Sequence, residues 1–202
     1  IPQPIACLPQ HINRKGSLKT HPQAFQAAFK HRKGSLKPPT PYFQAASPRS
    51  PTMQTRSGDL IALALAGEFD VIIHGCNCQH TMGAGIAKQI KTHFPAAYAA
   101  DCATPKGASK LGHISSATVD CNGRELIIVN AYTQDNWCGS GVLADYAAIR
   151  AAMRQVKAQF AGKRIGYPKI GAGLARGDWA TIAPIIDEEL AGEQHTLVIY
   201  EP

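Results

Sequence analysis

The pattern of apolar and polar positions divides the chain after residue 70 into alternating strands and helices. Short apolar runs typical of buried strands are followed by longer segments with apolar residues at helical spacing. Asn122-Gly123 is a strong hairpin turn signal between two of the strands. This alternation predicts an α/β fold with a mixed, mostly parallel sheet between helical layers. The expected strands are 71–76, 113–119, 125–129, 164–167 and 196–200, and the expected helices are 84–94, 143–160 and 179–190.

Two glycine-rich loops follow expected strands, where α/β sheets bind their ligands. The first covers residues 77–85 and the second covers residues 171–178. Glycine lets backbone N–H groups approach phosphate oxygens, and a helix N-terminus adds a favourable dipole. One such loop is more often an ordinary turn, but two in matched positions indicate a diphosphate held between them. Neither loop has the spacing of a P-loop or of the usual dinucleotide fingerprint.

Charge separates the first quarter of the chain from the rest. The 202 residues carry a formal net charge of +7, yet residues 1–57 hold nine Lys or Arg and no acid. The remaining residues hold twelve Lys or Arg against fourteen Asp or Glu, which argues against a DNA-binding fold. The segment 14–19 returns at 32–37. We expect residues 1–52 to be a basic, disordered tail with an 18-residue tandem repeat, and residues 53–202 to be the folded domain.

The six cysteines have irregular spacing, and no stretch reaches the roughly 18 apolar residues of a membrane helix. With no secretory signal in view, we expect reduced thiols in a cytoplasmic protein with no membrane partner. Cys76-Asn77-Cys78 is a C-x-C, unlike the C-x-x-C pairs of a zinc ribbon. His74 and His80 lie close by, but the sequence predicts no metal and no cofactor.

Together these motifs resemble the macrodomain family, whose members are ADP-ribose-binding α/β/α modules. The resemblance covers about residues 54–202 and implies a three-layer α/β/α fold. Within the family, residues 74–78 and 83–87 are similar to a subgroup that holds the ADP-ribose-1''-phosphate phosphatases and the smaller ADP-ribosyl hydrolases. The motifs, in the family's order, are Gly58-Asp59-Leu60, 73–78, 82–87, 168–174 and Asp178-Trp179.

The resemblance implies a binding role for particular residues. Asp59 would accept a hydrogen bond from the adenine amino group, with Leu60 and Tyr200 beside the ring, and Asn77 would hold the distal ribose. By their residue types alone, Asp59 also suits a helix N-cap and Asn77 a turn that binds its own backbone. The two amide loops for the diphosphate would be Gly83, Ala84, Gly85 and Ile86, and Gly171, Ala172, Gly173 and Leu174.

The candidate catalytic residues are His74, Asn77 and Asp178. Histidine titrates near neutrality and can act as an acid, a base or a nucleophile toward a terminal phosphate, and the resemblance to the phosphatase-like members implies this role for His74. Asp178 would orient His74 or a water, and Asp135 is a third candidate. The alternatives are a His74 buried on a backbone group and an Asp178 that caps the helix at Trp179.

The chain departs from the ester-cleaving hydrolases of the subgroup. It has Tyr132-Thr133-Gln134 where they have a Lys, and Ala175 where they have an Asp. We therefore expect a hydrolase that binds ADP-ribose and removes the phosphate from ADP-ribose-1''-phosphate. The alternatives are a reader of ADP-ribose without turnover and an ADP-ribosyl hydrolase acting on modified protein or nucleic acid.

Overall fold

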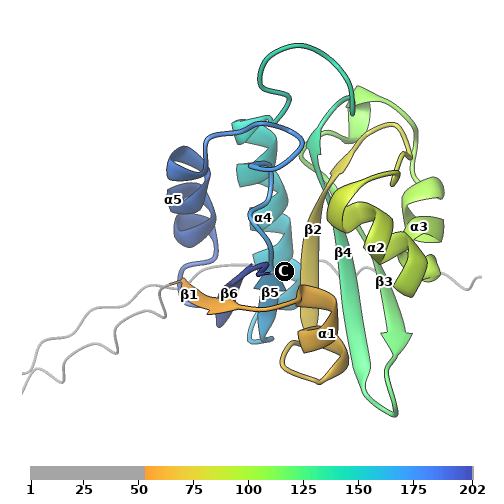
Figure 1. The fold of residues 1–202 in the computed structure, drawn as a ribbon, viewed down its shortest axis with the longest axis vertical. Coiled ribbons are helices and arrows are strands. Elements are labelled where there is room, and N and C mark those ends of the chain that lie inside the picture. Colours follow the sequence, from red (N-terminus) through yellow and green to blue (C-terminus); the bar gives the residue numbers. More distant parts are fainter. Residues whose placement is uncertain (1–52, 202) are drawn as a thin grey trace, which may run out of the picture. The chain divides into compact units, whose positions relative to one another are not determined.

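The computed structural model describes residues 53–201, and the predicted tail, residues 1–52, lies outside the described residues. A sheet of six strands, in the order β1-β6-β5-β2-β4-β3, lies between two layers of helices (Figure 1). Neighbouring strands are parallel except for β3 and β4, which form an antiparallel hairpin. The predicted α/β/α fold with a mixed sheet is confirmed. The strands are β1 (Gln54–Ser57), β2 (Val71–Asn77), β3 (Ile114–Asp120), β4 (Glu125–Gln134), β5 (Ile165–Tyr167) and β6 (His195–Ile199).

The two helical layers bury opposite faces of the sheet. Val71 and Ile73 of β2 pack in the cluster that contains α4 and α5, whereas Ile72 between them packs in the cluster that contains α1, α2 and α3. Successive side chains of a strand point to opposite faces, so a strand buried on both faces reads as a continuous apolar run. The helices are α1 (Leu60–Leu65), α2 (Gly85–His93), α3 (Pro95–Cys102), the 3-10 turn η1 (Ala108–Lys110), α4 (Tyr146–Phe160) and α5 (Trp179–Glu189).

Local signals explain where several elements begin and turn. Asn122 and Gly123 have φ of +58° and +79°, the left-handed pair of a type I′ turn, so the predicted hairpin is confirmed. α4 begins later than predicted because Asp145 caps it, its Oδ1 accepting the N–H of Ala148 at 2.8 Å. Pro95 does not simply end a helix, because it is also the first residue of α3, a position that suits proline. The periodicity gave no indication of α3, α1 or β1.

The topology places one opening at the middle of the sheet. After β2 the chain goes on to β3 and β4 on one side, and after β5 it goes on to β6 on the other. β2 and β5 are neighbours, so the loops that follow them diverge above the carboxyl ends of the two strands. Open α/β sheets bind ligands in the crevice at such a switch point.

Three further features bear on function. Within residues 53–201 no helix combines the length and the apolar character that a membrane crossing requires. In the same part of the chain, no group of three His, Cys, Asp or Glu side chains is placed to hold a metal ion. The cysteines of the described region, Cys76, Cys78, Cys102, Cys121 and Cys138, are free thiols.

Candidate functional site

A cleft of about 710 Å³ opens at the switch point, a size typical of ligand pockets. The carboxyl ends of β2, β4, β5 and β6 form its floor, and the loops after β2 and β5 form its walls. Both predicted glycine-rich loops therefore line the same cleft. Of the predicted binding residues, those that line it are Asn77, Gly83, Ala84, Gly85, Ile86, Gly171, Ala172, Gly173, Leu174 and Tyr200.

The loop after β2 leads into the N-terminus of α2. Ala84 is the N-cap residue, and its side chain makes no hydrogen bond. The first helical N–H group bonded to its carbonyl is that of Lys88. The N–H groups of Gly85, Ile86 and Ala87, which line the cleft, therefore have no partner within the helix. Together with the helix dipole they form an anion-binding wall.

The loop after β5 forms the opposite wall. Gly171 has a φ of +75°, a left-handed conformation that favours glycine, and its carbonyl accepts the N–H of Gly177 at 2.8 Å. The N–H groups of Gly173 and Leu174 make no hydrogen bond within residues 53–201. A Cβ at Gly85 would lie 3.5 Å from Leu174 Cδ1, so the two walls approach each other across the cleft.

The charge of the cleft favours an anion. Among residues 53–201, Lys169 is the one charged residue that lines it, and no Asp, Glu or His of this region does so. Unpaired amides and one ammonium suit a phosphate or diphosphate. The described lining therefore offers no carboxylate or imidazole for general acid–base catalysis.

The two ends of the cleft differ. At the β6 end lie Ile199 and the exposed ring of Tyr200, and at the β4 end lie Thr133, Gln134 and the exposed ring of Trp137. Because the strands run in the order β6-β5-β2-β4, the two amide walls, which follow β5 and β2, lie between these ends. A ligand that spans the cleft would thus have its anionic group in the middle.

Asn77 lies at the floor, and its side-chain amide binds its own loop, while its predicted contact with the ribose stays a prediction. Its Oδ1 accepts the N–H groups of Gln79 at 2.9 Å and Thr81 at 3.3 Å, and its Nδ2 donates to the carbonyl of Thr81 at 2.7 Å. This is the turn-holding arrangement that the sequence left open as the alternative. The side chain shapes the loop that carries the first amide wall.

His74 is not in the cleft, which corrects its predicted placement beside the phosphate-binding loops. The side chain is fully buried within the sheet and does not line the cleft. Its Nε2 lies 2.8 Å from Oδ1 of Asn130 on β4. Burial lowers the pKa of His74 to about 4, so the imidazole is neutral at physiological pH. A neutral, enclosed imidazole has no access to a phosphate in the cleft.

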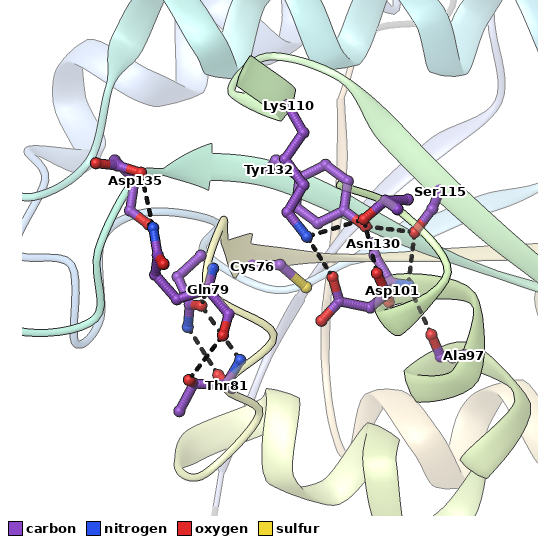
Figure 2. Close-up of polar contacts among 12 residues, drawn as sticks. Cys76, Gln79, Thr81, Ala97, Asp101, Lys110, Ser115, Asn130, Tyr132 and Asp135 are labelled. Atoms are coloured by element: carbon purple, nitrogen blue, oxygen red, sulfur yellow. Dashed lines mark hydrogen bonds and ion pairs between the residues drawn. The ribbon is translucent and has the colours of Figure 1, made fainter. Parts of the chain in front are cut away.

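Through Asn130, His74 belongs instead to a buried polar network. Figure 2 shows the part of this network in which Asn130 contacts Ala97 of α3 and Ser115. Asn130 Nδ2 donates to the carbonyl of Ala97 at 2.8 Å and to Oγ of Ser115 at 3.0 Å. Ser115 and the hydroxyl of Tyr132 lie 2.6 Å apart.

An ion pair adjoins this network, and one thiol links it to the cleft. Lys110 Nζ lies 2.7 Å from Asp101 Oδ1 and 4.0 Å from the centroid of the Tyr132 ring. The thiol of Cys76, which lines the cleft, lies 3.6 Å from His74 Nδ1. Burial raises the pKa of Cys76 well above its usual value, so this thiol is protonated.

The two predicted aspartates are helix caps. Asp178, predicted to be catalytic, does not line the cleft. Its Oδ1 accepts the N–H of Ala180 at 3.0 Å and its Oδ2 accepts the hydroxyl of Thr181 at 2.7 Å, which makes it the N-cap of α5. Hydrogen bonds from Thr181 and Ala180 lower its pKa. Asp59 caps α1 in the same way, through Ala62 N at 2.8 Å.

Of the three residues predicted to contact adenine, Tyr200 lines the cleft, whereas Asp59 and Leu60 stand beside it. Neither Asp59 nor Leu60 lines it, and Leu60 is buried in the core beneath α1. The N–H of Gly58 donates to the carbonyl of Ile199 at 2.9 Å, which ties Asp59 to the β6 end. Within the described residues, Asp59 Oδ2 makes no hydrogen bond, so the predicted contact with adenine stays a prediction.

Sequence reasoning missed the residues of the β4 end. Thr133, Gln134 and Trp137 line the cleft because β4 continues to Gln134, beyond the predicted end at residue 129. The strand-forming residues Tyr132 and Thr133 were a signal for the longer strand. Asp135, the third candidate, is exposed outside the lining and accepts a hydrogen bond from Gln79 Nε2 at 3.1 Å.

Sequence comparison relates most of the folded region to known proteins. The model of the family described as Macro domain matches residues 73–186. The uncharacterized 17.5 kDa protein in the tk-vs intergenic region of Enterobacteria phage T4 is 34% identical over 151 residues, which cover 72% of this chain and 94% of that protein.

Solved structures share the fold. The macrodomain of Mycobacterium tuberculosis DarG matches with a TM-score of 0.55 and 22% identity, covering 74% of this chain and 97% of that one. Thermosipho africanus DarTG in complex with ADP-ribose matches with a TM-score of 0.56 and 17% identity, covering 75% of this chain and 42% of that one. A Bacteroides thetaiotaomicron protein of unknown function matches with a TM-score of 0.59 and 22% identity, covering 74% and 99% of the two chains.

Proposed function

This chain belongs to the Macro domain family, and on that premise we propose that its cleft binds ADP-ribose. The observation that carries the proposal is the pair of facing amide walls. One wall contains the N–H groups of Gly85 and Ile86, and the other contains those of Gly173 and Leu174. Lys169 is the charged residue of the described lining. Unpaired N–H groups on both sides suit a diphosphate, which would enter the cleft between them. The DarTG structure in complex with ADP-ribose supports this choice of ligand.

The different residues at the two ends of the cleft support one direction for the ligand. The adenosine would lie at the β6 end, against Tyr200 and Ile199. Asp59 Oδ2, which makes no hydrogen bond within residues 53–201, would accept a hydrogen bond from the adenine amino group there. The distal ribose would lie at the β4 end, near Thr133 and Trp137. Aromatic faces at both rims suit a base and a sugar.

Calorimetric titration with ADP-ribose tests this proposal. A Cβ at Gly83 would meet only Thr81 Cγ2, at 3.8 Å, so Gly83→Glu adds a carboxylate to the cleft without straining the backbone. We expect the wild type to bind and Gly83→Glu to lose at least about tenfold in affinity, because the carboxylate repels the diphosphate. Ala96→Glu is the matched control, since Ala96 is exposed in the first turn of α3, outside the cleft lining. Absence of binding by the wild type would refute the proposal.

Dephosphorylation of ADP-ribose-1''-phosphate is the finer function we propose for the same cleft. Trp137 is 57% exposed, so the β4 end is open enough for a phosphate on the distal ribose. Water would attack phosphorus, the bond to the C1'' oxygen would break, and ADP-ribose and inorganic phosphate would leave. The amides and Lys169 would stabilise the negative charge of the transition state.

Because no Asp, Glu or His of residues 53–201 lines the cleft, binding is the primary proposal and turnover the secondary one. A phosphate-release assay on ADP-ribose-1''-phosphate separates them. If the wild type releases phosphate and Gly83→Glu does not, the result supports the phosphatase. Binding without release supports a reader of ADP-ribose or of ADP-ribosylated macromolecules, and loss of label from a modified protein or nucleic acid would support an ADP-ribosyl hydrolase.

A further inference from the structure

The loop between β4 and α4, residues 135–145, borders the cleft through Trp137, which lines it. Gly139 and Gly141, in the middle of this loop, have φ of +147° and +69°, and no helix or strand forms there. A segment without regular structure has no hydrogen-bonded ladder of its own to fix it. Its position at the cleft therefore depends on the contacts that it makes with other elements.

Backbone hydrogen bonds hold one end of the loop to the second amide wall. The N–H groups of Leu143 and Ala144 donate to the carbonyl of Ala175 at 2.9 and 3.2 Å. Residues 137–142 make no such bond: within residues 53–201, none of their backbone groups is paired with the backbone of another element. The middle of the loop is thus held by side chains alone.

The side chain of Arg176 makes this contact. Its Nη2 donates to the carbonyl of Gly139 at 2.6 Å. In the part of the chain that the structure describes, this is the one hydrogen bond that joins residues 137–142 to a residue outside the loop. Because the guanidinium is charged, the bond is stronger than one between two neutral groups.

The backbone of Arg176 belongs to the second amide wall. Its N–H donates to the carbonyl of Gly173 at 2.9 Å, and the N–H of the next residue, Gly177, donates to the carbonyl of Gly171 at 2.8 Å. One residue therefore joins two parts of the cleft. Its backbone closes the turn of the amide wall, and its side chain holds the loop that carries Trp137.

The conformation of Arg176 indicates that the side chain is the reason for an arginine at this position. Its φ is +58°, in the left-handed region where a residue with a Cβ is strained and glycine is not. The residue is exposed, so packing in the core does not account for it. Backbone strain of this kind persists where the surrounding structure fixes it, most often at functional sites. The contact with Gly139 is what the arginine adds.

We propose that Arg176 is a positioning residue, which holds residues 137–142 against the second amide wall and so keeps the cleft in the form that binds its ligand. A loop that is fixed beforehand need not be ordered by the ligand, so more of the interaction energy appears as affinity. Arg176 does not line the cleft, and its effect on binding passes through the loop. The inference rests on the proposed function, because it takes ADP-ribose as the ligand.

Three variants separate the contact from the strain. Arg176→Gly and Arg176→Asn suit a positive φ, but both lack the reach to the carbonyl of Gly139. We expect both to bind ADP-ribose about three- to tenfold more weakly than the wild type. Their thermal midpoints should stay within about 3 °C of the wild type, because relief of strain offsets the lost hydrogen bond. Arg176→Lys keeps the charge and a donor, and its affinity should stay within about twofold of the wild type.

Two further measurements exclude a charge effect and a merely structural role. A loss of affinity caused by the missing charge would disappear in about 1 M salt, where the Debye length is about 3 Å, whereas a loss caused by the freed loop should persist. In the protein without ligand, the 15N order parameters of residues 137–142 should be lower in Arg176→Gly than in the wild type, and Arg176→Lys should restore them.

The outcomes of these experiments distinguish the inference from the proposed function. Unchanged affinity in Arg176→Gly and Arg176→Asn, a loss that disappears in high salt, or unchanged order parameters would overturn the inference while leaving the proposed function intact. A wild type that does not bind ADP-ribose would overturn both. If Arg176→Gly does not fold, Arg176→Asn decides the question, because asparagine tolerates the same backbone conformation.

Discussion

The imidazole Nε2 of His74 lies 2.8 Å from Oδ1 of Asn130, and this contact defines His74 as part of the core. Asn130 uses its own Nδ2 to donate to Ala97 and Ser115, so its Oδ1 must be the acceptor. A neutral His74 therefore carries its proton on Nε2, and the thiol of Cys76 lies 3.6 Å from both ring nitrogens. The arrangement joins β2 to β4 below the cleft and keeps the imidazole out of the described cleft lining.

This burial predicts a dependence of stability on pH. The pKa of His74 falls from 6.5 to about 4 on folding, so between these values the unfolded chain binds a proton that the folded chain does not. The free energy of unfolding should therefore be highest above pH 6.5 and fall as the pH is lowered toward 4, by roughly 3 kcal/mol from this group. Urea denaturation at a series of pH values measures this change in the free energy of unfolding.

A matched variant isolates the contribution of His74. His195 is also a buried histidine, and its pKa too is lowered by burial, so it titrates in the same direction. His74→Gln keeps a donor where Nε2 lies but does not titrate. The variant should show a shallower loss of stability between pH 6.5 and 4 than the wild type, and it should bind ADP-ribose with unchanged affinity. Parallel pH profiles would contradict the account.

Replacing Asp178 should affect folding and leave ligand binding unchanged. Asp178→Ala removes the N-cap contacts to Ala180 and Thr181 and should lower the thermal midpoint, whereas Asp178→Asn keeps an acceptor for the cap and should lower it less. Because Asp178 does not line the cleft, both variants should titrate with ADP-ribose as the wild type does. A large loss of affinity for ADP-ribose in Asp178→Asn would contradict this prediction and indicate that Asp178 takes part in ligand binding.

The ion pair of Lys110 and Asp101 predicts a non-additive pair of variants. The two residues are 4% and 1% exposed, so Lys110→Met leaves a carboxylate buried without its cation and should cost about 3–5 kcal/mol of unfolding free energy. Adding Asp101→Asn removes that charge, and the double variant should recover part of the loss. Urea denaturation of the wild type, Lys110→Met and the double variant tests this prediction. A double variant less stable than Lys110→Met would show that the buried charge of Asp101 does not cause the loss of stability.

The sequence predicted the parts of this protein that depend on neighbouring residues. β2, the hairpin at Asn122-Gly123 and the two glycine-rich loops are local signals, and a parallel sheet brings the ends of its strands to one edge. Both amide walls were therefore foreseeable before their distances were known. The caps at Asp59 and Asp178 were also foreseeable, as the alternatives left open beside their functional roles.

What could not be predicted depends on contacts between distant segments. His74 and Asn130 are 56 positions apart, and no local pattern reveals that Asn130 accepts a hydrogen bond from His74. A β-bulge at Thr133 arises from the register of β4 against β2, and so does the closeness of Thr133 Oγ1 to Gly75. The resemblance assigned the distal ribose to Asn77, and that role stays a prediction.

The central claim is that two backbone-amide walls hold the diphosphate of ADP-ribose. The most direct measurement is a titration of 15N-labelled protein with ADP-ribose, followed by amide chemical shifts. The account predicts that the largest changes fall on Gly85, Ile86, Gly173 and Leu174, while the amide of Gly123, in the hairpin turn at the opposite end of β4, stays unchanged. Shifts that spare these four amides and gather elsewhere, or no shifts at all, would contradict it.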